Sequence, residues 1–347
     1  MGASMPDAVR HQHAALGPCN RRFRELRQPR RVLPYAPPVL DTARIAAEFG
    51  LGPPLSVSQL AEGHPDVTRL TTARGSFVVK PAYDADDADL YDRAAGVLSA
   101  AGIRQARPLR TTAGALVSDS GHTVQEFLPG QACLRPTGAQ TAATMRHVAA
   151  YHAALEEVPV PAGLHAGRTV WDRVASAEYL VAALPGLLRG HGPPGYAADG
   201  MIAAALSQVE RALPHMRELP RQLVHGDIGP DNVLMDGDEV IAIIDFTPLR
   251  EPVLFAVATA VYWNHVHGRR QLDPGGIRAC LDAAAPRPWT AAEREIWPAM
   301  LAREALRRLA TPLAVAAEAG SRPPAWPAAR YQAVVTLLES GRQLHAR

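Results

Sequence analysis

The sequence is short of lysine, cysteine and long apolar runs. Its 347 residues hold a single lysine, Lys80, beside thirty-five arginines. The three cysteines, Cys19, Cys133 and Cys280, are far apart and show neither metal-ligand spacing nor a disulfide framework. No apolar run reaches the ~18 residues that a membrane span needs. These absences argue against a disulfide-stapled or membrane-spanning protein and predict a cytoplasmic one.

Charge and hydrophobicity set further bounds. The 36 basic and 34 acidic side chains give a net charge of +2. No general attraction to nucleic acid or to an anionic membrane surface is therefore expected. Hydrophobic residues make up 47% of the chain, which is enough for a sizeable core. The length suits one two-lobed unit or two domains.

The first 38 residues differ from the rest of the sequence. They contain seven arginines against two acids, with few periodic apolar positions. They also lack the apolar segment of a secretory signal. A disordered basic tail over residues 1–38 is predicted, and a basic arm that contacts nucleic acid or lipid is the alternative.

One stretch gathers side chains that carry oxygen atoms. It reads Leu223-Val-His-Gly-Asp-Ile-Gly-Pro-Asp-Asn-Val-Leu-Met and continues with Val240-Ile-Ala-Ile-Ile-Asp-Phe. Asp227, Asn232 and Asp245 are thereby spaced five and thirteen residues apart. The apolar runs are typical of short strands, and the Asp-Gly-Asp between them is a hairpin turn signal. Asn232 and Asp245 are therefore expected on either side of one hairpin.

This layout is typical of a phosphoryl-transfer site. Asn232 and Asp245 offer the oxygen ligands that Mg²⁺ prefers. Asp227 lies in the preceding loop and is the candidate base for an attacking hydroxyl group. Phosphoryl transfer needs positioning and charge neutralisation more than covalent help from the protein. The alternative is an ordinary buried hairpin with acids on its surface.

The same spacing resembles the catalytic loop and metal-binding aspartate of protein kinases. The form His-Gly-Asp, in place of His-Arg-Asp, resembles the aminoglycoside phosphotransferase superfamily, which includes choline and homoserine kinases. The resemblance implies an α+β, two-lobed protein-kinase-like fold, with a small strand-rich N-lobe and a larger, mainly helical C-lobe. It implies a nucleotide-holding lobe over residues 39–129 and a lobe with the catalytic loop and acceptor site over residues 130–347. It further implies the use of ATP and Mg²⁺.

The single lysine fits this resemblance. Lys80 ends the strand-like run Gly75-Ser-Phe-Val-Val-Lys, and the family holds the nucleotide phosphates with a lysine at such a place. A compact ammonium can be needed where a broad guanidinium would not fit. The alternative is a surface lysine that persisted by chance. By position, Gly63 matches the family's turn that covers the nucleotide phosphates, although a plain turn fits almost as well. The backbone around Glu126 and Leu128 matches the segment that contacts the adenine, although an ordinary strand end fits as well.

The segment Asp86–Ala101 is predicted to be a helix. The family places a glutamate on this helix to pair with the lysine, and no glutamate is present here. By register, Asp92 is the predicted partner of Lys80, with Asp87 and Asp89 as alternatives. Each of these acids also fits a solvated helix start that complements the helix dipole.

Three further positions matter for the catalytic loop. Thr247 stands where glycine is commoner in the family. Phe255 stands where the family has an aspartate that braces the loop, so an apolar brace is expected in its place. His225 is expected to hold the loop by hydrogen bonds, as in the family it resembles, and not to act as the base.

Helices are expected over most of the remaining chain. Pro298 and Pro312 are expected to kink or divide the longest of them. The predicted helices are Asp41–Phe49, Gln140–Glu157, Trp171–Leu184, Ala197–Leu213, Pro252–His267, Gly275–Ala285, Ala291–Glu318 and Ala328–His345.

The leading hypothesis is an ATP- and Mg²⁺-dependent kinase that phosphorylates a hydroxyl group of a small molecule, such as an antibiotic, a sugar or an amino alcohol. From residue 131 onward the chain has 21 arginines and 21 acids, so no acidic surplus favours a polycationic aminoglycoside. An acceptor that bears a carboxylate would need an arginine, for which Arg250 is one candidate. A nucleotide-binding regulatory module with weak or no turnover is the alternative, suggested by Phe255 and the missing glutamate. A protein kinase is disfavoured, because no Ala-Pro-Glu segment follows Asp245.

Overall fold

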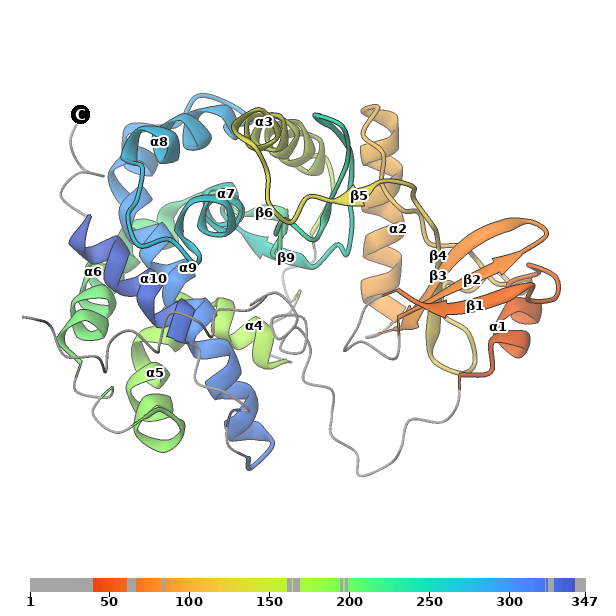
Figure 1. Cartoon of the computed structure of the whole chain (residues 1–347), viewed down its shortest axis with the longest axis horizontal. Helices are drawn as coiled ribbons and strands as arrows, with labels where there is room; N and C mark the ends of the chain where they lie inside the picture. The colour runs from red at the N-terminus through yellow and green to blue at the C-terminus, as the bar shows by residue number, and fades with distance from the viewer. Residues whose placement is uncertain are drawn as a thin grey trace, which may run out of the picture. The chain divides into compact units, whose positions relative to one another are not determined.

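The computed structural model describes residues 40–60, 67–82, 85–160, 164, 169–193, 196, 199–321, 323 and 328–340. The predicted tail over residues 1–38 and the predicted contact Gly63 lie outside this part of the chain. The described residues divide into two compact units (Figure 1). One holds the residues up to Ala82 together with Arg110–Val124, and the other holds the remainder. The lobe division after residue 129 stays a prediction.

The smaller unit holds a four-stranded sheet except for the last two residues of its fourth strand, which belong to the larger unit. In spatial order its strands are β1 (Ser56–Gln59), β2 (Thr68–Thr72), β3 (Gly75–Pro81) and β4 (His122–Glu126). Helix α1 (Thr42–Glu48) begins after Asp41, whose carboxylate accepts a hydrogen bond from the Arg44 main-chain N–H at 2.9 Å. This cap satisfies one of the unpaired amides at the start of the helix. The predicted strand that ends near Lys80 is confirmed as β3, which pairs antiparallel with β2 and has Gly75 opposite Thr72.

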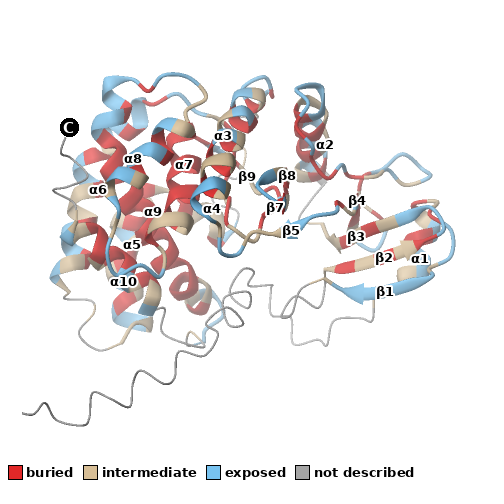
Figure 2. Cartoon of the chain, turned by 45° about the horizontal axis from the view of Figure 1, so that its top comes forward, coloured by how far each residue is buried: buried red, intermediate tan, exposed pale blue. Residues whose placement is uncertain are grey.

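The larger unit is mainly helical. Its helices are α2 (Ala85–Ala100), α3 (Gly138–Leu155), α4 (Val170–Ala175), α5 (Ala177–His191), α6 (Gly200–Glu218), α7 (Val253–Val261), the π-helix η4 (Tyr262–Val266), α8 (Pro274–Ala283), α9 (Ala291–Glu318) and α10 (Ala328–Glu339). Every residue of α7 is buried, as is most of α9 (Figure 2). None of the described helices is long and apolar enough to cross a membrane.

Two helices are divided differently from the prediction. Pro298 and Pro312 do not divide α9, which runs continuously over Ala291–Glu318. It packs against α4, α5, α6, α7 and α10, and this burial offsets the cost of about 3 kcal/mol for a proline in a helix. The predicted helix Trp171–Leu184 is instead split into α4 and α5. Ser176 between them is extended, and its hydroxyl caps α5 by accepting a hydrogen bond from Tyr179 N–H at 3.3 Å.

Two small sheets within the helical unit carry the predicted site. One consists of β5 (Gln131–Ala132), β7 (Val233–Asp236) and β8 (Glu239–Ile243), and the other pairs β6 (Gln222–His225) with β9 (Pro248–Glu251). Strands β7 and β8 pair antiparallel, and the turn between them holds Gly237 at a φ of +57°, which glycine adopts without strain. The hairpin prediction is therefore confirmed.

Candidate active site

His225, at the end of β6, ties together the segments that carry the predicted site residues. Its Nδ1 atom accepts hydrogen bonds from the main-chain N–H groups of Asp227 at 3.2 Å and Thr247 at 3.5 Å. Because Nδ1 accepts these hydrogen bonds, the imidazole proton is on Nε2. Nε2 donates to the Ile244 carbonyl oxygen at 3.1 Å. The side chain is fully buried. These contacts confirm that His225 holds the loop.

A second histidine supports the first. The Nδ1 atom of His152 donates to the Val148 carbonyl oxygen at 2.9 Å, and its Nε2 atom accepts from the His225 main-chain N–H at 3.4 Å. Burial lowers the pKa of His152 to about 4, against the opposing effect of the Val148 hydrogen bond. The imidazole is therefore neutral at physiological pH, as an acceptor at Nε2 requires.

Asn232 lies at the open end of the hairpin, beside the segment that leads to Asp245. Its main-chain carbonyl oxygen accepts a hydrogen bond from the main-chain N–H of Ile244 at 2.8 Å. Its side-chain Nδ2 donates to the Asp227 carbonyl oxygen at 2.7 Å. The nitrogen of the Asn232 side-chain amide is thereby directed into the loop. The amide is planar and rigid, so this hydrogen bond also fixes the position of its oxygen Oδ1. The structure thus brings the three predicted residues Asp227, Asn232 and Asp245 into one region.

Asp245 has an unusual backbone. Its φ of +57° makes it the one residue other than glycine with a positive φ in the part of the chain that the structure describes. Aspartate tolerates this left-handed conformation better than most residues, although at some cost. Backbone strain of this kind collects at functional sites. Asp245 is exposed and lies two residues after Ile243, the buried end of β8.

Gly226 gives the loop a close approach to its neighbour. A Cβ atom at this position would meet the Leu249 side chain, with Leu249 Cγ at 2.9 Å, and the Thr247 carbonyl oxygen at 3.4 Å. The Gly226 N–H donates to that carbonyl at 2.8 Å. Glycine is needed at this position because a larger side chain would not fit, and not because of its backbone conformation, since the φ of Gly226 is not positive.

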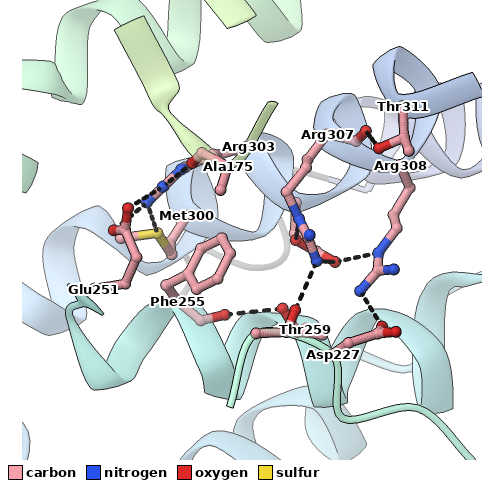
Figure 3. Close-up of polar contacts among 12 residues, drawn as sticks. Ala175, Asp227, Glu251, Phe255, Thr259, Met300, Arg303, Arg307, Arg308 and Thr311 are labelled. Carbon is pink, nitrogen blue, oxygen red and sulfur yellow. Dashed lines mark hydrogen bonds and ion pairs between the residues drawn. The ribbon is translucent and has the colours of Figure 1, made fainter. Parts of the chain in front are cut away.

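Two arginines that the sequence reasoning missed contact the loop from α9. Arg307 donates from Nη2 to the Gly226 carbonyl oxygen at 3.1 Å, and Arg308 donates from Nη2 to Asp227 Oδ1 at 2.9 Å (Figure 3). Both arginines donate to Glu304, one turn earlier on α9. A sequence signal existed, because Glu304, Arg307 and Arg308 have the i, i+3 and i+4 spacing of an ion-paired helix face within an otherwise apolar stretch.

The prediction that Phe255 alone braces the loop as an apolar contact is corrected by the position of Arg307. The Phe255 ring does not meet the loop as a bare hydrophobic contact, since the guanidinium of Arg307 lies over it with 5.2 Å from Cζ to the ring centroid. Arg303 lies over the same ring at 4.5 Å. The loop is therefore braced by a hydrogen bond from Arg307, and Phe255 supplies the aromatic surface on which that arginine rests.

The charges of the cluster stabilise one another. Burial opposes the charge on Arg308, but the nearby Glu304 and Asp227 outweigh it and raise the pKa of Arg308. Burial likewise acts to raise the pKa of Glu304, and the two arginines reverse this and lower it. Burial, with repulsion from Arg308, lowers the pKa of Arg307. Glu304 is therefore ionised, and an ionised Glu304 is what the two buried guanidinium groups require.

Helix α2 contributes an aromatic group next to Asp245. The buried Tyr91 ring lies 5.6 Å from the Phe246 ring, centroid to centroid, and its hydroxyl oxygen accepts from Gln105 Nε2 at 2.8 Å. Burial, and to a smaller extent the charge of Asp245, raise the pKa of Tyr91. Asp92, the next residue, accepts from Arg107 Nε at 3.3 Å. The pairing of Asp92 with Lys80 stays a prediction.

The remaining predicted nucleotide contacts are distributed over both units. Lys80 is half-buried at the end of β3 in the smaller unit, where its carbonyl oxygen accepts from Thr123 Oγ1 at 3.3 Å. Glu126 and Leu128 belong to the larger unit, where the buried Leu128 side chain packs with Leu234 of β7. Their roles toward a nucleotide stay predictions.

Arg250 lies away from the loop. On β9 it pairs with Leu223, four residues before Asp227. It lines a surface hollow with Glu156, Val158, Val160, Pro220, Arg221 and Gln222, none of which belongs to the loop. The arginine that contacts Asp227 is instead Arg308.

A model of the phosphotransferase enzyme family matches residues 56–289, more than half of the chain. The chain therefore belongs to the phosphotransferase enzyme family.

The chain is also similar to curated homoserine kinases. A homoserine kinase from Methylobacillus flagellatus is 44% identical over 93 residues, which cover 26% of this chain and 29% of that protein. A homoserine kinase from Rhodopseudomonas palustris is 26% identical over 287 residues, which cover 79% of this chain and 83% of that protein. The chain thus spans less than a third of the length of the first relative and most of the second.

Solved structures share the fold. An aminoglycoside phosphotransferase from Alicyclobacillus acidocaldarius has a TM-score of 0.60 at 17% identity, covering 91% of this chain and 99% of that one. A spectinomycin phosphotransferase in complex with ADP and spectinomycin has a TM-score of 0.51 at 15% identity, covering 83% and 89%. These similarities confirm the predicted two-lobed α+β fold.

Proposed function

We propose that this protein is an ATP- and Mg²⁺-dependent kinase that transfers a phosphoryl group to a hydroxyl group of a small molecule bearing a carboxylate. The observation that carries the proposal is the network around His225. It ties Asp227, the segment before Asp245 and the hairpin end at Asn232 into one rigid unit. Rigid positioning of acid and amide groups is the main requirement of phosphoryl transfer.

Asn232 and Asp245 fit the needs of a magnesium ion. An amide oxygen and a carboxylate are hard oxygen donors, and Mg²⁺ uses few protein ligands because it keeps water and phosphate oxygens. A bound Mg²⁺ would neutralise charge on the phosphates.

The chain's own residues have separate roles in this proposal. Asp227 accepts the hydrogen bond of the acceptor hydroxyl group, orients it toward the terminal phosphate and takes its proton. Lys80 binds the nucleotide phosphates. Asn232 fixes the loop through its hydrogen bond to the Asp227 carbonyl oxygen.

The curated relatives support an acceptor that carries a carboxylate. Homoserine, the substrate in their names, carries a hydroxyl group, a carboxylate and an ammonium group. The Arg308 guanidinium contacts the Asp227 carboxylate directly, and its charge is balanced by Asp227 and Glu304.

Phosphate transfer to a panel of acceptors tests this function. With ATP and Mg²⁺, we expect kcat/KM for homoserine and related hydroxy acids to exceed that for choline and aminoglycosides by at least about tenfold, which corresponds to about 1.4 kcal/mol. ADP release and the mass of the phosphorylated product are measured together. A preference for the cationic acceptors would overturn the acceptor class. Thermal stabilisation by ATP and Mg²⁺ without any transfer would instead indicate the regulatory module.

The single lysine gives a second test. Replacing Lys80 by Arg is expected to raise KM for ATP about tenfold, because a broad guanidinium cannot take the place of a compact ammonium. Arg69→Lys is the matched reverse exchange on the neighbouring strand β2, where Arg69 donates to Ser76 Oγ, and it is expected to leave KM unchanged. An unchanged KM in Lys80→Arg, with normal folding by circular dichroism, would remove Lys80 from the site.

A further inference from the structure

Arg308 reaches the loop as part of a closed network of charges. The carboxylate of Glu304 is fully buried, and both of its oxygens are engaged. Oε1 accepts from Arg308 Nε at 2.6 Å and from Arg307 Nη2 at 2.9 Å, and Oε2 accepts from Arg307 Nε at 2.6 Å. Two positive and two negative groups, counting Asp227, thus neutralise one another.

Aromatic rings limit the movement of both guanidinium groups. Trp263 lies under Arg308, with 4.9 Å from Cζ to the ring centroid. Trp263 belongs to the π-helix η4, which continues α7. Such wide turns alter the direction of the side chains that follow and are frequent at functional sites. Arg308 is held by Glu304 on one side, by Trp263 on its face, and by Asp227 at its tip.

Stability alone does not account for this arrangement. A buried ion network loses much of its Coulombic gain to desolvation, and apolar residues of similar size are often equally stabilising. Helix α9 is otherwise rich in buried apolar residues. Apolar replacements could not donate hydrogen bonds to the loop, as Arg307 does to Gly226 and Arg308 does to Asp227.

We infer that Arg308 is a positioning residue for the reaction, which holds Asp227 through Oδ1 so that Oδ2 faces the acceptor hydroxyl group. The inference rests on the proposed function. Glu304 sets the position of Arg308, and Arg307 fixes the adjoining Gly226 backbone. A carboxylate with one oxygen bound to a stacked guanidinium cannot rotate freely, so the reactive oxygen keeps one direction.

The helix offers a matched control. Arg303, five residues before Arg308 on α9, is also buried, lies over Phe255 and pairs with Glu251 at 3.1 Å. It also donates to the Ala175 carbonyl oxygen (Figure 3). Among the described residues, none of these Arg303 contacts involves Gly226 or Asp227. Arg303→Ala therefore removes a comparable buried arginine without removing a hold on the loop.

Kinetics of the full-length variants with ATP and the best acceptor test the inference. Arg308→Ala is expected to lower kcat about 10²-fold, as expected for a misplaced reacting group, with KM for ATP within about threefold of the parent. Arg308→Lys is expected to recover part of this loss, because an ammonium can reach Asp227 or Glu304 but does not span both. Millimolar guanidinium is expected to restore part of kcat to Arg308→Ala. Arg303→Ala is expected to lose thermal stability and to keep kcat within about twofold.

Two outcomes overturn the inference. One is a folded Arg308→Ala variant whose kcat stays within threefold of the parent. The other is an Arg303→Ala variant that loses as much kcat as Arg308→Ala. If the parent itself transfers no phosphate, the proposed function fails, and crystal structures of the parent and Arg308→Lys still decide the positioning role. A changed Asp227 side-chain direction in Arg308→Lys supports it, and an unchanged direction overturns it.

Discussion

Replacing Asp227 by Ala is expected to lower the rate of phosphate transfer about 10³-fold, within the range of general acid–base contributions. The reason is that Asp227 is held in the loop at two points, with its main-chain N–H bound to His225 and its carboxylate bound to Arg308. KM for ATP is expected to change little, because Asp227 is assigned to the acceptor and not to the nucleotide. Initial rates with saturating ATP, measured by ADP release, check the result.

Asp236→Ala is the matched control for this change. Asp236 ends β7 on the same hairpin and is exposed. Its removal is expected to leave turnover unchanged. If Asp227→Ala, folded by circular dichroism, keeps turnover within threefold of the parent, Asp227 is not the base and the proposed site is wrong.

Replacing Glu304 by Gln is expected to lower the free energy of unfolding by about 3–5 kcal/mol, since it leaves two buried guanidinium groups without their shared counter-charge. The pKa of Glu304 is lowered in the folded protein. Its contribution is therefore complete above the ordinary glutamate pKa and is lost as the pH falls through the lowered one. Urea unfolding at neutral pH, followed by circular dichroism, measures the change.

Glu295→Gln provides the comparison on the same helix. Glu295 is exposed near the start of α9, where a single charge changes stability by less than about 1 kcal/mol. A similar unfolding free energy for Glu304→Gln and Glu295→Gln would show that the buried network does not hold α9 against the loop. That result would also remove the anchor assigned to Arg308.

Some features of this protein followed from local patterns in the chain. The hairpin that separates Asn232 from Asp245 was predictable because Asp236-Gly-Asp lies between two apolar runs, and turn chemistry acts over a few residues. The helix bounds Ala291–Glu318 were predictable for a similar reason, since Thr290 and Glu293 form a capping box in the structure.

Predictions that depended on packing were less successful. The prolines of α9 suggested a kink or a division, but α9 is undivided because its neighbours bury it. Phe255 suggested an apolar brace, and the arginines over its ring could not be foreseen because they are far away in the sequence. Arg250 was one candidate because it is close to Asp245 in the chain, yet it lines a separate hollow.

The sequence by itself determined the family, the hairpin and the identity of the three oxygen-bearing residues, because spacing and turn signals are local properties. Only the tertiary structure decided what holds Asp227. Arg308 lies 81 residues further along the chain, and no periodicity links two positions so far apart. Their meeting depends on how α9 packs against α7, and that is set by the shapes of many buried side chains together.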